Sequence, residues 1–201
     1  MDRQKVLLRI WLTCITIMMG SAAWAAPLGE FSPVVGNWRQ DNVDGGTVLI
    51  VDGSQRAVSS NEHFPIAAYL PQTDFHDGTI TVQFKPIAGK SDQAGGIFFD
   101  RKDNGDYLVV RANALEGNLN LYRYATGRRT PIQEVDNAPA QTGVWHELKL
   151  VISESHVQGY LDGKPLLQYD LDRNISGGVG LWSKDDSVIM FKDFHVASKK
   201  P

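Results

Sequence analysis

The sequence predicts an all-β protein whose strands form a two-sheet antiparallel sandwich. Three observations lead to this prediction. Apolar and polar residues alternate with a period of two in many short segments, which turn residues separate. Beyond Ala26 there is no heptad repeat and no long amphipathic helical pattern. At least eight such segments follow one another closely, and short strands without helices bury their apolar side by packing sheet on sheet.

The first expected strand covers residues 79–85, where three apolar residues alternate with polar ones. The other expected strands lie at 96–99, 107–111, 118–124, 146–152, 157–161, 178–182 and 188–196. Clean alternation is typical of antiparallel sheets that have one packed face and one polar face. Hairpin turns are expected at Asn104-Gly105 and Asp162-Gly163, because both pairs tolerate the positive φ that tight hairpins need.

The N-terminal segment has the features of an export signal. A basic start precedes an apolar run at residues 10–19, and the small-residue triplet Ala23-Trp24-Ala25 follows it. This pattern predicts a signal peptide at residues 1–25 with cleavage near Ala25, and a periplasmic or secreted protein with no membrane span after processing. A retained membrane anchor is the alternative, but the run is shorter than the roughly 20 apolar residues that span a bilayer.

Length and composition limit what the remaining chain can be. The protein has 201 residues, which fits a single β-sandwich domain at residues 26–201 with its core at about 30–197. A net charge of −3 gives no support for a nucleic-acid partner, since phosphate binding needs a basic surplus. The one cysteine, Cys14, lies in the expected leader. The mature chain would therefore have neither a thiol nucleophile nor a cysteine metal site.

Several of these segments resemble a known family in their order. They lie at 95–101, 106–111, 119–124, 145–149, 159–164, 177–182 and 191–196. Together they resemble the concanavalin A-like lectin/glucanase superfamily, in particular its laminin G-like domains close to the bacterial 3-keto-disaccharide hydrolase type. The resemblance implies a jelly roll whose concave sheet commonly meets carbohydrate. Its motifs are strand and turn residues, which specify the fold more strongly than the function.

One face of the expected sheets carries the candidate ligand-binding residues. If Ile80, Val82, Leu108, Leu119 and their neighbours point into the core, period two sends a polar and aromatic set to the opposite side. That set comprises Gln83, Lys85, Tyr107, Arg111, Asn120, Tyr122, Tyr124 and Trp182, with Asn113 and Lys184 beside them. Aromatic rings pack under the C–H faces of sugars, and planar polar groups bind hydroxyls. The alternative is that these residues are ordinary cross-strand pairs on a solvated sheet.

No catalytic residue can be assigned from spacing. Family 16 glycosidases carry the motif E-x-D-x-x-E, and the partial match that starts at Glu134 has Pro139 in place of the third carboxylate. This segment is therefore interpreted as a solvated loop. Lys85, Arg101, Arg111 and Glu147 have suitable chemistry for action on keto-sugars, but none of them can be named acid or base.

Asp100, Asp103 and Asp106 are weak candidates for a calcium site, because calcium prefers oxygen ligands. Lys102 falls where an oxygen ligand belongs, so a solvated hairpin turn is the preferred interpretation. Residues 184–186 are interpreted as a similar turn. No cofactor other than calcium is indicated.

Three functions remain open from the sequence. The first is an exported carbohydrate-binding, lectin-like domain that recognises a glycan or glycoside on its concave sheet. The second is a hydrolase or lyase that acts on 3-keto-glycosides or related sugars, and the third is an envelope protein-interaction domain. The sequence predicts no particular oligomeric state.

Overall fold

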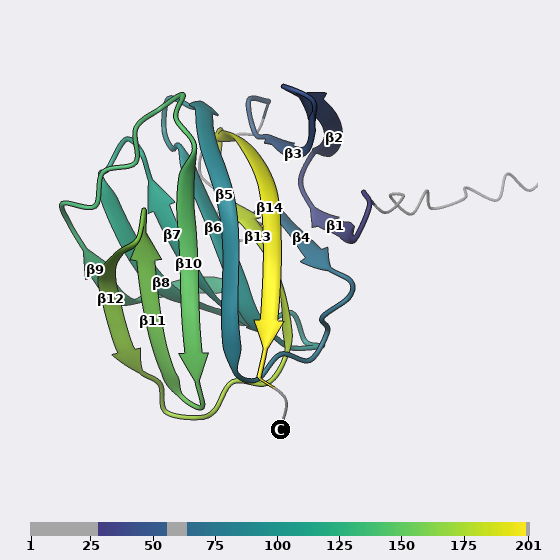
Figure 1. The fold of residues 1–201 in the computed structure, drawn as a ribbon. Coiled ribbons are helices and arrows are strands. Elements are labelled where there is room, and N and C mark those ends of the chain that lie inside the picture. The colour runs from purple at the N-terminus through teal and green to yellow at the C-terminus, as the bar shows by residue number, and fades with distance from the viewer. Residues whose placement is uncertain (1–27, 56–63, 200–201) are drawn as a thin grey trace, which may run out of the picture.

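The computed structural model describes residues 28–55 and 64–199. Within these ranges the chain forms fourteen strands and no helix, arranged as two antiparallel sheets of seven strands packed face to face (Figure 1). The predicted two-sheet antiparallel jelly-roll sandwich is therefore confirmed. In the part of the chain so described, no helix is long and apolar enough to cross a bilayer. The expected leader at residues 1–25 lies outside the described residues.

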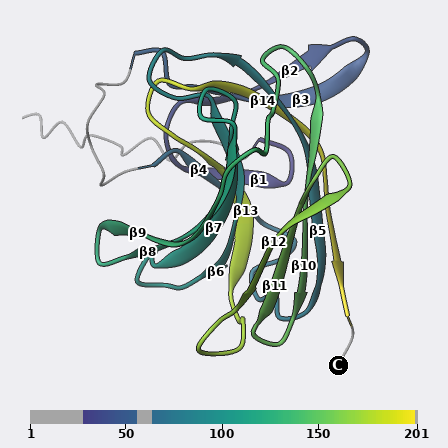
Figure 2. The same ribbon diagram turned by 90° about the vertical axis from the view of Figure 1, so that its left-hand side faces the viewer.

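The first sheet, called sheet 1 below, carries the candidate site. In spatial order its strands are β1 (Phe31–Val35), β4 (Ile66–Tyr69), β13 (Gly178–Ser183), β6 (Ala94–Arg101), β7 (Tyr107–Asn113), β8 (Asn118–Ala125) and β9 (Arg128–Val135). Figure 2 shows the sheets nearly edge-on, with β8 and β9 curling away from the other sheet. The outer face of sheet 1 lies on the side toward which these strands curl.

The second sheet, sheet 2, covers the inner face of sheet 1. In spatial order its strands are β12 (Lys164–Asp170), β11 (His156–Leu161), β10 (His146–Ser153), β5 (Gly78–Ala88), β14 (Val188–Ser198), β3 (Gly46–Asp52) and β2 (Trp38–Val43). Strand β5 lies at the centre of this sheet, between β10 and β14. Because β5 belongs to sheet 2, its outward side chains cannot share a face with those of sheet 1.

The main core lies between the two sheets, as the alternation predicts. Ile80, Val82 and Phe84 of β5 are buried in it, and Leu108 and Val110 of β7 reach it from the other sheet. Burial of such side chains contributes about 25 cal/mol per Å² of apolar surface, which makes this layer the main source of stability. The inward-facing positions are thus confirmed on both sheets.

The eight predicted strands are all present, and the Asp162-Gly163 hairpin is confirmed with φ of 50° and 76°. Sequence reasoning missed six strands, among them β9. This strand contains Glu134 and Val135, for which the interpretation as a loop is wrong because β9 pairs along β8 from Leu119 to Ala125, whereas residues 136–139 of the same segment form no strand. The hairpin between β8 and β9 brings charged residues onto the outer face of sheet 1.

Candidate functional site

The outer face of sheet 1 is a second buried layer. Period two along β7 points Tyr107, Val109, Arg111 and Asn113 outward, yet their exposed fractions are only 5%, 0%, 2% and 0%. A second apolar cluster accounts for this burial. It contains Phe64, Ile66, Ala94, Phe98, Tyr107, Val109, Tyr122 and Trp182. This face is therefore preorganised and largely dry.

Phe64, in the chain that leads into β4, covers the centre of this layer. Its ring centroid lies 5.1 Å from that of Trp182 and 5.9 Å from that of Tyr124, where the contact is edge-on. Trp182 is consequently fully buried, and its indole N–H donates to the Tyr107 hydroxyl over 3.2 Å. Trp182 thus supports the site from beneath.

A chain of polar contacts crosses the middle of the face. Arg111 Nη2 donates to Glu116 Oε2 over 2.8 Å and to the Tyr122 hydroxyl over 3.2 Å. The same hydroxyl accepts from Asn120 Nδ2 over 2.9 Å and donates to Glu134 Oε1 over 3.2 Å. The Tyr122 hydroxyl therefore accepts two hydrogen bonds and donates one, which is its full capacity.

The charged residues in this series of polar contacts interact with one another. Partial burial raises the pKa of Glu116, but the Arg111 charge and hydrogen bonds from Asn118 and Arg111 outweigh it, so the pKa of Glu116 is lowered. Arg129 lies over the Tyr122 ring, with its guanidinium carbon 4.3 Å from the ring centroid. Glu116 and Glu134 remain exposed at the two ends of this series of polar contacts.

A hollow of about 240 Å³ opens at the Tyr107 end of β7. Tyr107 and Tyr124 line it and stack on each other, with ring centroids 4.8 Å apart and planes inclined by 18°. The lining residues are Val34, Val35, Phe64, Ile66, Arg101, Asn104, Gly105, Asp106, Tyr107, Tyr124, Thr126 and Gly127. The hollow is thus lined by aromatic, aliphatic and polar residues together.

A β-bulge turns Arg101 toward this hollow. Phe98 pairs with Gly180 and Arg101 with Gly178, so β6 contains one residue more than β13 between these two pairs. Asp100 occupies the bulge with φ of 57°, a left-handed conformation that Asp adopts more readily than most residues. Because the extra residue reverses the alternation, Arg101 shares the outer face with Phe98.

Asp100 is held in place by cations and is not available to a metal. It is 1% exposed and accepts from Arg173 Nη1 over 3.2 Å and from the Ser176 backbone N–H over 2.9 Å, with Lys102 Nζ 2.9 Å away. The turn between β6 and β7 is therefore anchored by ion pairs of the buried Asp100 carboxylate with two partly exposed cations. Within the described ranges no three Asp, Glu, His or Cys side chains gather as metal ligands, so Asp100, Asp103 and Asp106 do not converge.

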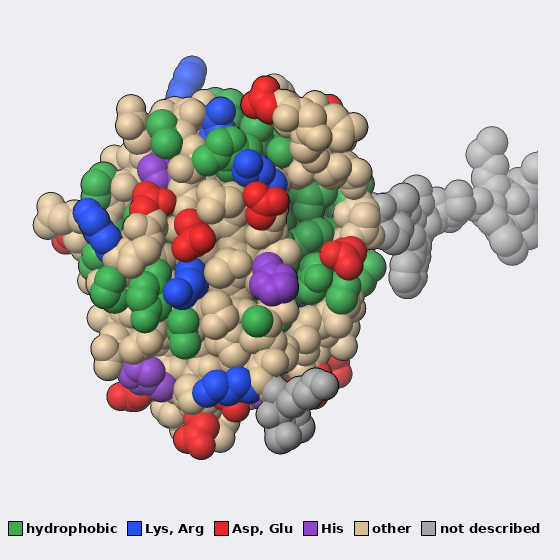
Figure 3. Space-filling view, viewed as in Figure 1, with side chains coloured by type: hydrophobic (Ala, Val, Ile, Leu, Met, Phe, Trp, Pro, Cys, Tyr) green, Lys and Arg blue, Asp and Glu red, His purple; other side chains and the backbone are tan. Residues whose placement is uncertain are grey.

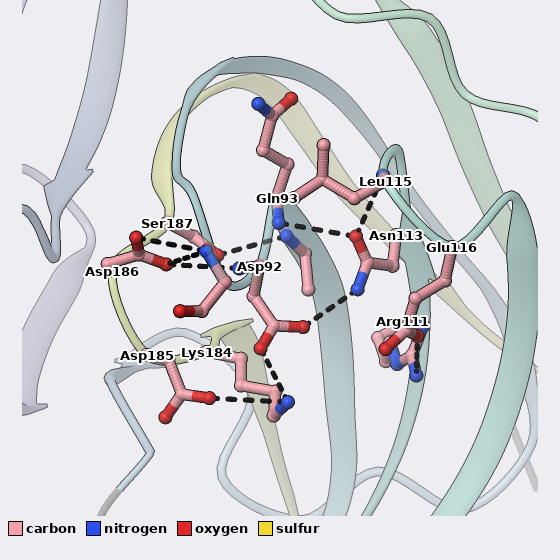
Figure 4. A network of polar contacts seen from close by, with 12 residues as sticks. Asp92, Gln93, Arg111, Asn113, Leu115, Glu116, Lys184, Asp185, Asp186 and Ser187 are labelled. Atoms are coloured by element: carbon pink, nitrogen blue, oxygen red, sulfur yellow. Dashed lines mark hydrogen bonds and ion pairs between the residues drawn. The ribbon is translucent and has the colours of Figure 1, made fainter. Parts of the chain in front are cut away.

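A polar network closes the opposite end of the face (Figure 4). Asn113 Oδ1 accepts from the backbone N–H groups of Gln93 and Leu115, and its Nδ2 donates to Asp92 Oδ1 over 2.7 Å. Lys184 Nζ lies 2.5 Å from Asp92 Oδ2 and 3.2 Å from Asp185 Oδ2. The network therefore connects three places: the start of β6, the loop after β13 and the end of β7.

Asp186 fastens the loop that carries Asp92. Its carboxylate accepts from three consecutive backbone N–H groups, those of Lys90, Ser91 and Asp92, over 2.6 to 3.1 Å. Burial raises the pKa of Asp92 to about 6, although the hydrogen bond from Lys184 opposes that rise. The turn expected at residues 184–186 is present, but its residues are half-buried and not solvated, because they bind Asp92 and its loop.

The structure separates the predicted ligand-binding residues into two groups. Tyr107, Arg111, Asn120, Tyr122, Tyr124 and Trp182 share the outer face of sheet 1. Gln83 and Lys85 do not share it, because β5 belongs to sheet 2 and both side chains point away from the core on the outer face of that sheet. The expectation of one common face is thus wrong for these two residues. Figure 3 shows the outer face of sheet 2, on which basic and acidic side chains lie interspersed.

The structure adds residues that sequence reasoning missed. Phe64, Glu116 and Arg129 contact the predicted set, and Asp92 anchors it. One signal for Arg129 was present: Thr126-Gly127 has φ of 52° and 78°, and it forms the hairpin that pairs β9 with β8. The other residues come from loops with no comparable local pattern.

Solved structures share this fold. The carbohydrate-binding module CBM66 from Bacillus subtilis matches with a TM-score of 0.64 and 16% identity, over 82% of this chain and 93% of the module. A galectin-like protein of unknown function from Bacillus subtilis matches with a TM-score of 0.60 and 16% identity, over 85% and 90%. A β-glucanase from Bacillus licheniformis matches with a TM-score of 0.53 and 10% identity, over 88% and 96%.

At such low identity the likeness is one of fold. The chain therefore has a galectin-like, concanavalin A-like jelly-roll sandwich. Its sequence matches no protein-family model and no curated protein.

Proposed function

We propose that this protein binds a glycan or glycoside on the outer face of sheet 1, in the hollow beside Tyr107 and Tyr124. The observation that carries the proposal is the stacked pair of tyrosines, with centroids 4.8 Å apart, in a hollow that polar residues also line. Aromatic surface of this kind packs against the C–H groups of a sugar, while the polar residues supply donors and acceptors for its hydroxyls. The shared fold with a carbohydrate-binding module supports the same role.

Preorganisation strengthens this proposal. Tyr107 is held by the Trp182 indole, and Arg101 is aimed by the bulge at Asp100. A ligand that enters a preformed site avoids much of the entropy cost of ordering side chains. The volume of about 240 Å³ lies just below the range of pockets for drug-sized ligands, which suits a sugar ring or a chain end.

The proposal is tested by calorimetric titration with a panel of oligosaccharides and glycosides. Tyr124→Ala removes half of the stacked pair and is expected to weaken binding at least about tenfold, because stacked aromatic residues carry much of such binding energy. Tyr160→Ala is the matched control, since Tyr160 is half-buried on sheet 2 beneath Lys149. Absence of saturable binding to every sugar, or equal losses in both variants, contradicts the proposal.

A second candidate function is sugar hydrolysis or lysis, in line with the resemblance to 3-keto-disaccharide hydrolases. One observation favours it: Glu116 and Glu134 are linked through Arg111 Nη2 and the Tyr122 hydroxyl by contacts of 2.8, 3.2 and 3.2 Å. The two carboxylates therefore lie no farther apart than the upper end of the range of about 6.5–9.5 Å in inverting glycosidases. Turnover of a 3-keto-glycoside that is lost in Glu134→Gln, with binding retained, would establish this function.

We further propose that the protein acts in the periplasm or outside the cell, after removal of residues 1–25. The basic start, apolar run and Ala23-Trp24-Ala25 triplet support this location. N-terminal sequencing of the protein recovered from the cell envelope or medium is expected to begin near Ala26. Recovery of the intact chain in the membrane fraction would support a retained anchor.

A further inference from the structure

Two guanidinium groups on the outer face of sheet 1 carry buried N–H groups that have no acceptor. The atoms are Nε of Arg101 and Nη1 of Arg129. Within the described ranges neither arginine forms an ion pair, whereas Arg111, Arg123 and Arg173 each have a carboxylate partner. Arg111 also has an unpartnered Nε, but its Nη2 donates to Glu116 and Tyr122 and its Nη1 donates to Asn118.

Both guanidinium groups lie beside the stacked tyrosines. Arg101 lines the hollow, and Arg129 pairs in register with Tyr124 and lies with its guanidinium carbon 5.1 Å from the Phe64 centroid. Burial raises the pKa of Tyr107, and the charges of Arg129 and Arg101 are near enough to oppose that rise. The two cations therefore approach the same tyrosine from strands β9 and β6.

The carboxylates of this region are already occupied. Asp106 lines the hollow, but its Oδ1 accepts from the Thr126 backbone N–H over 2.9 Å and its Oδ2 accepts from Asn104 Nδ2 over 3.0 Å. Asp100 is bound by Arg173 and Lys102. Neither of them forms an ion pair with Arg101 or Arg129 within the described ranges, so both guanidinium groups keep donors for an added anion.

A buried N–H without an acceptor costs free energy, and native proteins rarely leave one unpaired. A ligand that supplies an anionic acceptor would remove this cost. The planar guanidinium fork matches a carboxylate in a bidentate arrangement, and such charge-assisted bonds are stronger than those to neutral hydroxyls. The tyrosines provide the surface for the sugar ring, and the arginines provide the partners for its charge.

We propose that the sugar bound beside Tyr107 and Tyr124 carries a carboxylate, as uronic acids do, and that Arg101 and Arg129 bind this carboxylate. The inference rests on the proposed function and adds the chemical class of the ligand. It predicts specificity for acidic over neutral sugars of the same size.

The test uses the mature chain and pairs of oligosaccharides that differ only in charge. Oligogalacturonides, oligoglucuronides and oligomannuronides are titrated beside their methyl esters and the corresponding neutral hexose oligomers. At least one uronate series is expected to bind about tenfold or more tightly than its methyl ester. Its affinity is expected to fall with rising salt, while any residual affinity for neutral sugars stays constant.

Arg101→Gln and Arg129→Gln are expected to remove this preference, each weakening uronate binding about tenfold or more. Arg128→Gln is the matched control, because Arg128 is exposed, lies next to Arg129 in β9 and carries the same charge. Thermal unfolding of each variant identifies one that fails to fold. Arg129 packs on Tyr122 and Phe64, so Arg101→Gln is the decisive variant if Arg129→Gln unfolds.

The outcomes separate the two proposals. Uronate binding that is unchanged in Arg101→Gln, or neutral sugars that bind as tightly as the uronates, overturns the carboxylate inference and leaves the proposed function intact. Binding of a sulfated sugar without binding of any uronate also overturns the inference, in favour of a tetrahedral anion. No saturable binding to any charged or neutral sugar overturns both proposals.

Discussion

The two outer faces of the sandwich arise from the same alternating pattern and end in different states. On sheet 1 the outward side chains Tyr107, Arg111 and Trp182 are buried beneath a second layer. On sheet 2 the outward side chains Gln83 and Lys85 are half-exposed, as an ordinary solvated face requires. The difference arises because residues before β4 and in β9 cover the outer face of sheet 1. No described residue covers the outer face of sheet 2 in this way.

The polar contacts of the two faces also differ in burial, since those on sheet 1 are more deeply buried than those on sheet 2. Sheet 1 holds a closed network in which Asn113 is fully buried and bound on three sides. Sheet 2 holds cation–π contacts, with Lys192 Nζ 4.6 Å and Lys85 Nζ 5.9 Å from the Trp145 centroid. Buried networks contribute to a unique structure, whereas exposed charges contribute little to stability. Substitutions on the two faces should therefore differ in cost.

The largest effect is expected for Asn113→Ala. This change leaves the N–H groups of Gln93 and Leu115 without an acceptor and removes a donor from buried Asp92. A loss of about 3–5 kcal/mol in the free energy of unfolding follows from these unsatisfied groups. Urea unfolding measures it, with Gln83→Ala on sheet 2 as the control within about 0.5 kcal/mol. Similar losses in both variants would show that the two faces do not differ.

This contrast also marks how far the sequence could predict the site. Alternation is local, so it correctly oriented Leu108 inward and Tyr107 outward. Membership of a sheet is set by long-range pairing, and nothing local in residues 79–85 shows that β5 lies between β10 and β14. Gln83 was therefore assigned to the wrong face of the molecule although its orientation along the strand was correct.

Two further features escaped prediction for physical reasons. The bulge at Asp100 breaks the alternation, since one residue with φ of 57° moves Arg101 to the outer face. The Asp92–Lys184 pair joins residues 92 positions apart, and a charged side chain in a loop is solvated unless the fold buries it. Neither event leaves a periodic signal in the sequence.

The next largest effect is a pH dependence that belongs to Asp92. Burial raises the pKa of Asp92 to about 6 in the folded protein, against its ordinary value of 3.8. The folded state therefore binds more protons than the unfolded state between about pH 4 and 6, and its stability falls as the pH rises through this window. One pKa unit corresponds to about 1.4 kcal/mol, so the total change is on the order of 3 kcal/mol.

Urea unfolding at several pH values measures this effect as a difference between the wild type and Asp92→Asn. The stability of the wild type relative to Asp92→Asn is expected to decrease from pH 4 to pH 7. The lowered pKa values of Glu116 and Asp186 act in the opposite direction, but they are common to both proteins and cancel in the difference. Parallel pH profiles would show that Asp92 ionises normally.

A smaller effect is expected when the cover of sheet 1 is opened by Phe64→Ala. Phe64 is 3% exposed but lies in a loop and not in a strand, where the backbone can close part of the space that the ring leaves, so the loss is expected at about 2 kcal/mol, below the usual 3–5 kcal/mol of a core phenylalanine. The same change uncovers Trp182, which is fully buried in the wild type. Acrylamide quenching in a Trp145→Phe background should therefore increase. Unchanged quenching would show that Phe64 does not shield the indole.

The smallest effects are expected on sheet 2, at the two lysines that contact Trp145. Lys192 lies nearer the ring than Lys85, at 4.6 Å against 5.9 Å, so Lys192→Ala should cost more than Lys85→Ala. Both losses should stay below about 1 kcal/mol, since cation–π contacts at exposed sites contribute about 0.5–1 kcal/mol. Neither change should alter binding of a sugar on sheet 1. Because Lys85 has the charge and flexibility of a typical ligand-binding residue, a measured loss of sugar affinity in Lys85→Ala would move the site to sheet 2. The buried layer on sheet 1 would then contribute to the stability of the fold and not to sugar binding.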